Sequence, residues 1–335
     1  MKLLVIRNSA MGDVTLLHPC FKAMKELFPA VQLIFLTKSP FDQLFKDIDN
    51  VTCITGDYQG KHKGITGLIR LAGEIYKVHQ PDIVLDLHDV LRSKVIRSYF
   101  KTKRIPVHVM DKNRKARADL ISGRNKKPLP HIVEVYADVF KCAGFDLSSV
   151  LKRKSARGDK RVSDTPLSVG IAPFAKHELK TWPLPNIKEL MRLIQSRYPV
   201  EFYLFGGKED LSGLQEIEKE VAQSKIVAGK YTLNEELELM KSLDVFISMD
   251  SANMHLANLA GIKVYSIWGA TDPLAGFSAW NQPPENSISI SLDELRCRPC
   301  TVYGRGTCYR KDLACLNWLT PEKVFTEMEQ KGAFI

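Results

Sequence analysis

Short apolar runs alternate along the chain with longer segments in which apolar residues recur every three or four positions. In the first half, five short runs rich in β-branched residues predict strands at residues 2–7, 32–37, 51–55, 82–87 and 104–109. Helical spacing is clearest at residues 65–79, and it also predicts helices at 14–28 and 131–142, the last ended by Gly144. Pro19 fits the helix 14–28 only near its first turn or at a kink.

The second half repeats this alternation without repeating the sequence. Its apolar runs predict strands at residues 167–172, 200–205, 226–228, 243–248 and 263–268. Its helical patterns lie at residues 185–196, 211–222, 234–241 and 252–260, and an amphipathic helix is predicted at 321–330. The polar, basic segment 152–165 has no such pattern and predicts a linker.

Strands that alternate with helices predict an α/β fold with parallel sheets and right-handed crossovers. Because 335 residues are many for one core, we expect two doubly wound, Rossmann-like domains facing a cleft. Residues 1–155 would form the first domain and 156–320 the second. The C-terminal segment 321–335 is expected to cross back onto the first domain.

Composition places the chain among soluble globular proteins, with 44% hydrophobic and 26% charged residues. No apolar run approaches the roughly 18 residues that span a bilayer. The apolar run at the start is too short for a secretory signal and ends at Arg7. The seven cysteines, an odd number, fit a reducing compartment better than a disulfide framework. We therefore expect a cytoplasmic protein.

Positive charge is concentrated in one segment. The net charge is +10, and ten of the basic residues lie between positions 101 and 127 against only two acids. Such a patch fits an anionic partner, which could be nucleic acid, a phosphorylated glycan or an acidic membrane surface, although a solvated loop face is an equally good interpretation. The patch has little aromatic interleaving and no nucleic-acid motif, so we expect no nucleic-acid partner.

The turn after the first predicted strand, residues 8–13, carries Gly12 but not the G-x-G-x-x-G pattern of a dinucleotide site. A nicotinamide or flavin site in this half is therefore not expected. The turn does supply a carboxylate, Asp13, at the start of a helix. Asp13 could cap that helix, or it could act as a general base in the cleft.

A polar turn also follows the strand 243–248, where the stretch 248–257 reads SMDSANMHLA. Asp250 or Ser251 can cap the following helix, and His255 can lean back over the same end. The free N–H groups and the positive end of a helix suit phosphate at this edge of a parallel sheet.

Two further turns lie on the same predicted edge. Lys180, and four residues earlier Lys176, could supply a charge to a diphosphate, although each could simply be solvated. Trp182 before Pro183 is expected to pack beneath this loop. In the glycine-containing turn 205–210, Glu209 could bind a ribose hydroxyl. The three turns together favour a nucleotide site.

Four cysteines cluster near the C-terminus: Cys297, Cys300, Cys308 and Cys315. A C-x₂-C pair with two further cysteines can form a closed tetrahedral zinc site, but the longer spacings are not those of a standard finger. Three interpretations stay open: a structural zinc, a redox-sensitive or disulfide loop, and packed free thiols. Cys20, Cys53 and Cys142 lie in apolar patterns and are expected in the core.

Five motifs, in order along nearly the whole chain, resemble those of the glycosyltransferase family 9 heptosyltransferases. The stretch 7–14 resembles R-x-S-x-x-G-D, and 86–93 resembles D-x-Q-G-x-x-[KR]-S with His88 and Asp89 where Gln and Gly are usual. The stretch 180–183 matches K-x-W-P. The stretch 250–257 matches D-[ST]-G-x-x-H-[LI]-A with Ala252 in place of Gly, and 269–273 matches G-x-[TS]-x-P.

The resemblance implies a GT-B fold and an inverting transferase that moves a heptose from ADP-heptose to the lipopolysaccharide core, with no metal required. It implies that Asp13 is the base, that Lys180 holds the donor diphosphate, and that the stretch around Asp250 binds the donor. Together with the residues singled out above, the candidate site residues are then Asp13 for catalysis, Lys180, Asp250, Ser251, Ala252, His255, Lys176 and Glu209 for the donor, and Arg92, Lys112, Arg114 and Arg117 for an anionic glycolipid acceptor.

With such an acceptor, the protein would work at the cytoplasmic face of the inner membrane as a peripheral protein. A transferase for another nucleotide sugar and a sugar-nucleotide epimerase are the alternative functions. An epimerase would turn over without any acceptor.

Overall fold

The computed structural model describes residues 1–152 and 165–334, which form two compact units. Among these residues, the first unit holds 1–112 and 132–152, and the second holds 113–131 and 165–334. Almost all of the predicted linker 152–165 lies outside the described residues. No helix in the described part of the chain is long and apolar enough to cross a membrane.

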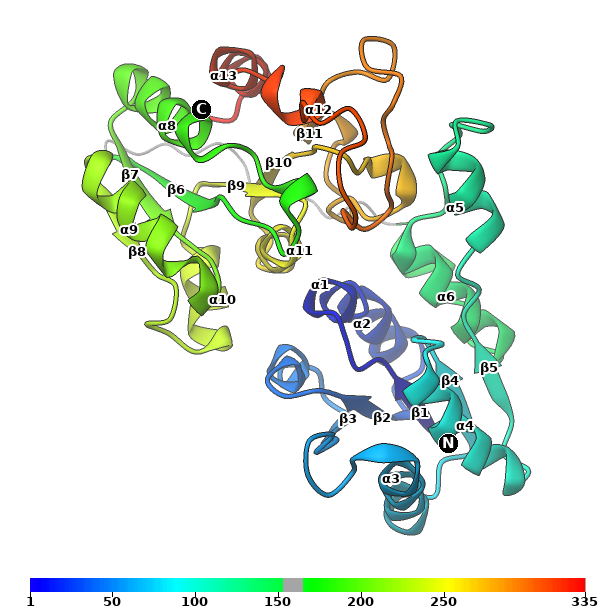
Figure 1. Ribbon diagram of the computed structural model, residues 1–335. Coiled ribbons are helices and arrows are strands. Elements are labelled where there is room, and N and C mark those ends of the chain that lie inside the picture. The colour runs from blue at the N-terminus through cyan, green and yellow to red at the C-terminus, as the bar shows by residue number, and fades with distance from the viewer. Residues whose placement is uncertain (153–164, 335) are drawn as a thin grey trace. The chain divides into compact units, whose positions relative to one another are not determined.

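The first unit is built on a five-stranded, fully parallel sheet with the order β3-β2-β1-β4-β5 (Figure 1). Its strands are β1 (Lys2–Ile6), β2 (Gln32–Thr37), β3 (Val51–Thr55), β4 (Ile83–Asp86) and β5 (Val107–Val109). All five predicted strands of this half are confirmed. Side chains of β1 alternate between the two faces of the sheet, so that Leu4 and Ile6 enter a core that α3 and α4 cover.

The helices of this unit are α1 (Met11–Thr15), α2 (His18–Leu27), α3 (Gly64–His79), α4 (Leu91–Thr102), α6 (Ile132–Cys142) and α7 (Ser148–Leu151). The single helix predicted at 14–28 is wrong, because the chain forms two helices. Pro19 lies in the first turn of α2, where its missing N–H costs no helical hydrogen bond, and the break falls just before it. Gly144, with φ of 96°, follows α6 as predicted.

The second unit contains a six-stranded parallel sheet with the order β11-β10-β9-β6-β7-β8. Its strands are β6 (Leu167–Ala172), β7 (Val200–Leu204), β8 (Ser224–Ile226), β9 (Val245–Met249), β10 (Lys263–Ile267) and β11 (Ser287–Ile288). β8 begins two residues before the predicted strand 226–228 and ends at its first residue. β11 was not predicted, because a strand of two residues is too short to show an alternating pattern of apolar and polar residues.

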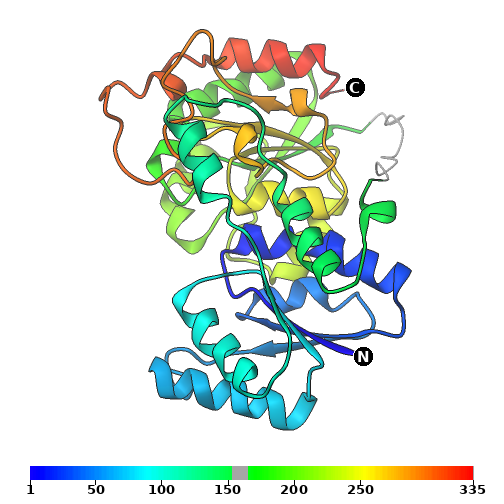
Figure 2. The same ribbon diagram turned by 90° about the vertical axis from the view of Figure 1, so that its right-hand side faces the viewer.

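The larger helices of the second unit agree with the predicted segments. They are α8 (Leu184–Arg197), α9 (Leu211–Glu220), α10 (Leu233–Lys241), α11 (Ala252–Leu259) and α13 (Pro321–Gln330), with the short α12 (Ala314–Asn317). α13, for which a return to the first domain was expected, packs against α8 of the second unit (Figure 2). α5 (Arg114–Ile121) also belongs to this unit, although the predicted boundary included it in the first domain.

Strand order determines where a ligand can bind on each sheet. The chain starts in the middle of each sheet, at β1 and at β6, and moves outward first to one side and then to the other. The helices that follow β1 and β4 therefore lie on opposite faces of the first sheet, and those that follow β6 and β9 lie on opposite faces of the second. This arrangement opens a crevice at the carboxyl ends of those strands. The turns after these four strands contain most of the predicted site residues.

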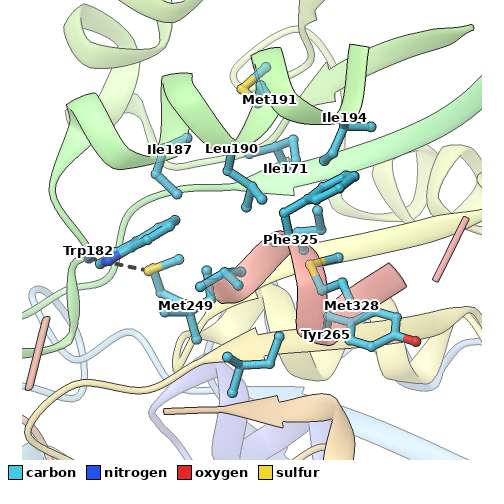
Figure 3. Packing of buried hydrophobic residues seen from close by; sticks show 14 of the residues in the cluster. Ile171, Trp182, Ile187, Leu190, Met191, Ile194, Met249, Tyr265, Phe325 and Met328 are labelled. Atoms are coloured by element: carbon cyan, nitrogen blue, oxygen red, sulfur yellow. Dashed lines mark hydrogen bonds between the residues drawn. The ribbon is translucent and has the colours of Figure 1, made fainter. Parts of the chain in front are cut away.

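Trp182 forms the floor of one of these turns. Its side chain is completely buried among α8 and the sheet, as predicted, and its backbone N–H points to the sulfur of Met249 at 3.3 Å (Figure 3). The indole Nε1–H donates to the carbonyl oxygens of Leu316 and Leu319 at 3.0 and 2.9 Å. Trp182 thus attaches the loop of Lys180 to the segment that leads into α13.

Replacing Trp182 with Phe should lower the free energy of unfolding by about 1–3 kcal/mol, because two buried carbonyl groups lose their donor. Urea unfolding followed by circular dichroism measures this. Trp318→Phe is the matched control, since Trp318 is half exposed and should change stability by less than about 0.5 kcal/mol. Equal losses in the two variants would contradict the structural role of the indole N–H.

Candidate functional site

Asp13 lies at the carboxyl edge of the first sheet, in the third residue of α1. Its Oδ2 forms an ion pair with Arg7 at 2.7 Å and accepts a hydrogen bond from the N–H of Ala10 at 3.2 Å. The N-cap residue is Ala10 and not Asp13. Asp13 contributes to the capping of α1 only because its side chain accepts the backbone N–H of Ala10. The Asp13 side chain keeps 24% of its surface exposed, which leaves an oxygen accessible to a ligand.

Arg7 fixes this carboxylate in place. It is the first residue after β1, and its side chain is only 8% exposed. One guanidinium nitrogen donates to the carbonyl oxygen of Leu87 at 2.6 Å, just past the end of the neighbouring β4. The same guanidinium therefore joins the two central strand ends and holds Asp13 above them. Arg7 belongs to the family motif, but no role was predicted for it.

His88 is a buried neutral group beside Asp13. Burial and, next, the charge of Arg7 lower the pKa of His88 to about 4, against the opposite influence of Asp86 and Asp13. Its Nε2 lies 3.5 Å from the hydroxyl of Ser9. A neutral imidazole at this position can exchange hydrogen bonds as the amide of Gln does, so the replacement preserves the charge of the site.

The turn after β4 is organised by the fully buried Asp86. Its Oδ1 accepts the backbone N–H groups of His88 and Asp89 at 3.0 and 2.9 Å, and its Oδ2 pairs with Arg97 at 2.7 Å. Asp89 adopts a φ of 45°, in the left-handed region, which explains why Gly is usual there and why Asp is tolerated. Lys112 donates to the carbonyl oxygen of Asp89 at 2.7 Å.

Arg92 lies in the first turn of α4 and is exposed. Its guanidinium sits 4.1 Å from the ring centre of Tyr58, whose hydroxyl donates to Asn8 at 2.7 Å. Stacking on Tyr58 restricts Arg92 without using its N–H donors, so it can still bind an anion. Of the residues predicted for the acceptor, Arg92 and Lys112 lie in the first unit and Arg114 and Arg117 in the second.

Arg117 is already engaged within the second unit. Its guanidinium lies 5.2 Å from the ring centre of Phe277 and 5.7 Å from that of Tyr303, and it donates to the Tyr303 hydroxyl. These contacts attach α5 to the loops of this unit. An acceptor role for Arg114 and Arg117 stays a prediction.

Lys180 and Asp250 come together at the carboxyl edge of the second sheet. Lys180 ends the short 3₁₀ helix η2 (Glu178–Lys180) after β6, and Asp250 follows β9 directly. Their side chains pair at 2.9 Å, with 16% and 7% of their surfaces exposed. The hydroxyl of Thr271 donates to Asp250 at 2.7 Å, so Asp250 orients Lys180 rather than capping α11.

The residues around the start of α11 differ in burial and in their contacts. Ser251 occupies the N-cap position, but its side chain makes no capping bond and its hydroxyl is 3.2 Å from that of Ser248. Ala252 is the first helical residue and is partly exposed, whereas His255, one turn on, is buried. An incoming group at this helix end would therefore meet backbone N–H groups beside the Lys180 ammonium.

Two other residues predicted to bind the donor have exposed side chains. Lys176 is exposed in the loop before η2, as its solvated interpretation requires. Glu209 is exposed in the 3₁₀ helix η3 (Lys208–Asp210), and its carboxylate lies over Gly207, where a Cβ would come within 2.5 Å of it. Their donor-binding roles stay predictions.

Arg298 supports the loop of Thr271 from below. It is 1% exposed, donates to the carbonyl oxygens of Gly269 and Thr271 at 2.7 and 3.0 Å, and pairs with Asp272 at 3.3 Å. It also donates to the carbonyl oxygen of Ile290. No role was predicted for Arg298. The available signal was an arginine enclosed between the two cysteines of the C-x₂-C pair.

The cysteine cluster is not arranged as a zinc site. Among the described residues, no group of three or more His, Cys, Asp or Glu side chains could hold a metal ion. Instead Cys315 is buried in the main core of the second unit, and Cys297, Cys300 and Cys308 pack against that core as free thiols. Burial raises the pKa of Cys315 to about 11, which keeps its thiol protonated at neutral pH.

The three remaining cysteines were all expected in the core. Cys20 is buried and Cys53 is partly buried, but Cys142 is exposed, and the expectation for Cys142 is wrong. It lies at the last residue of α6, where the helix leaves the core.

Comparison with known proteins identifies the family. The model of glycosyltransferase family 9 (heptosyltransferase) matches residues 73–307. The chain belongs to glycosyltransferase family 9. It is 25% identical to the lipooligosaccharide heptosyltransferase 2 of Campylobacter jejuni over 98% of this chain and 99% of that protein.

Solved structures show the same fold. The glycosyltransferase family 9 protein of Veillonella parvula has a TM-score of 0.73 at 17% identity, covering 98% of this chain and 96% of that one. The ADP-heptose lps heptosyltransferase II of Escherichia coli has a TM-score of 0.69 at 16% identity, with 98% of each chain covered. This family 9 transferase therefore has the GT-B fold, as the sequence resemblance implied.

In this transferase, breaking the Lys180–Asp250 pair should cost roughly 2–4 kcal/mol of unfolding free energy, since one charge stays buried alone. We expect that loss in Lys180→Met. The double variant Lys180→Met/Asp250→Asn should recover at least half of it, because the remaining amide is neutral and can still accept from Thr271. Urea unfolding of the single and double variants measures the coupling. Additive losses would show that the two side chains do not interact.

Proposed function

We propose that this transferase moves a heptose from ADP-heptose to an anionic lipopolysaccharide-core acceptor, with inversion at the anomeric carbon. The support is family membership together with the names of the relatives, a lipooligosaccharide heptosyltransferase and an ADP-heptose lps heptosyltransferase. The observation that carries the proposal is the buried Lys180–Asp250 pair, because it holds an ammonium group at the crevice of the second sheet.

The proposed donor site uses Lys180 for the diphosphate. An ammonium group has three N–H donors, and Asp250 engages one side of it, so the remaining donors can bind phosphate oxygens. The start of α11 adds backbone N–H groups and a positive dipole end. Negative charge develops on the departing ADP, and these groups would stabilise it. We assign Ser251, Ala252 and His255 to the donor as well, with Lys176 and Glu209 as outer contacts.

The proposed acceptor chemistry uses Asp13. Its carboxylate takes the proton of the acceptor hydroxyl while that oxygen forms a bond to the anomeric carbon. The bond from this carbon to the phosphate oxygen breaks at the same time, and ADP leaves with the electron pair. Arg7 keeps the Asp13 carboxylate oriented for this role. Arg92, Lys112, Arg114 and Arg117 are proposed to bind the negative charges of the acceptor.

Replacing Asp13 with Asn should lower kcat by roughly 10²–10⁴-fold and leave donor affinity nearly unchanged, because the amide cannot accept the proton. ADP release with a lipopolysaccharide-core acceptor measures turnover. Asp49→Asn is the matched control, since Asp49 is an exposed, lysine-paired carboxylate of the same unit. The Asp13→Asn substitution also leaves Arg7 without its carboxylate partner, so unfolding is measured alongside. Near-normal turnover in a folded Asp13→Asn enzyme would rule out Asp13 as the base.

The donor nucleotide can be identified by thermal shift. ADP-heptose at 100 times its Kd should stabilise the protein by about 2.7 kcal/mol, whereas GDP- and UDP-sugars should have little effect. Lys180→Met should abolish the shift. Preference for another nucleotide would redirect the proposal to a different donor, and turnover of the sugar nucleotide without any acceptor would favour an epimerase.

A further inference from the structure

The outer side of α3 and α4 carries an apolar groove away from the residues already discussed. The two helices lie side by side on one face of the first sheet (Figure 2). Between them is a cavity of about 410 Å³, lined by Ile69, Lys94, Val95, Ser98, Tyr99 and Thr102. The inner sides of both helices are buried in the core, so this groove opens outward.

Large exposed aliphatic side chains precede the groove by one turn on both helices. Ile65 and Ile69, one turn apart on α3, are 65% and 45% exposed, and Leu91 at the start of α4 is 78% exposed. A soluble monomer rarely gathers exposed aliphatic residues on one face without a partner.

Two of the three hydroxyl groups in the groove are engaged within α4. The Ser98 hydroxyl donates to the carbonyl of Lys94, and the Thr102 hydroxyl donates to that of Tyr99, both within α4. Val95 and Ile69 offer hydrocarbon alone. The groove thus combines hydrocarbon with the Lys94 ammonium, a combination that suits acyl chains beneath anionic head groups.

Positive charge borders the apolar strip. α4 carries Arg92, Lys94, Arg97 and Lys101 and no acidic residue, and Lys103 and Arg104 follow it. Lys94 and Lys101 lie two turns apart on the same side of the helix, beside the groove, and Lys101 is exposed. At the far end, the Lys103 ammonium lies 5.5 and 5.7 Å from the ring centres of Tyr76 and Tyr99.

We propose that this α3–α4 face docks on an anionic lipid bilayer. Ile65, Ile69 and Leu91 enter the boundary between head groups and acyl chains, and Lys94 and Lys101 bind lipid phosphates. The role of this docking in catalysis rests on the proposed function, in which the acceptor is attached to a lipid. α4 begins directly after the turn of Asp86, so docking through α4 holds the edge that carries Asp13 close to the membrane surface.

Vesicle flotation of the full chain tests the proposal. We expect binding to vesicles of phosphatidylglycerol and phosphatidylethanolamine, and at least tenfold weaker binding to phosphatidylcholine alone. Ile69→Ser should weaken the binding about tenfold, because an apolar anchor is lost. Lys101→Gln should weaken it about fivefold at low salt and less at high salt.

Val78→Ser is the matched control. Val78 lies on α3 and is 71% exposed, but it is nine residues from Ile69, about half a turn around the helix. Its replacement should leave vesicle binding unchanged. Equal weakening by Val78→Ser, or full binding by Ile69→Ser, overturns the proposal.

A second measurement separates this surface from the transferase activity. Ile69→Ser should release ADP at the wild-type rate with a water-soluble, delipidated acceptor, and more slowly with acceptor in vesicles. Lost vesicle binding with intact soluble turnover supports the docking face. If the wild-type protein does not bind anionic vesicles, the docking face is overturned and the proposed function stands. If no acceptor gives turnover, the proposed function is overturned, and the flotation result still decides whether this face binds lipid.

Discussion

The position of charge in this protein follows from the order of its parallel strands. Each sheet has one place where neighbouring strands send their helices to opposite faces, and the backbone there cannot be covered by either helix. Arg7 with Asp13, and Lys180 with Asp250, occupy these two places. Both pairs are largely buried, so each charge depends on its partner for stability, and each pair fixes the orientation of a group that a ligand can reach.

The bounds of helices and strands could be predicted to within a few residues where a helical pattern extended over several turns or where turn residues flanked an apolar run. The strands β2, β3 and β6 and the helix α13 have the expected bounds. Prediction failed where tertiary structure decides: the two-residue β11 exists through pairing with β10. Likewise half of the residues of α5 are charged, and Arg117 attaches this helix to the second unit by packing against two aromatic rings.

The site was predictable in its residue types and less so in its contacts. Asp250 or Ser251 was predicted as the cap of the helix, but the Asp250 carboxylate pairs with Lys180 and accepts from Thr271 instead. Arg298 and Asp86 could not be assigned from spacing, since their partners are backbone groups brought close by folding. His88 and Asp89 differ from the Gln and Gly that are usual in the motif, but His88 keeps the site neutral and Asp89 keeps the left-handed backbone conformation.

The path of the chain limits how this molecule can be divided. Residues 113–131 belong to the second unit, yet α6 and α7, which follow them, belong to the first. A fragment that ended near residue 155 would therefore carry α5 without Phe277 and Tyr303, and a fragment that began there would lack the segment whose Leu129 N–H donates to Leu274. Neither half is a complete unit of folding, so synthesis of the chain must pass residue 303 before the segment 113–131 can make all of these contacts.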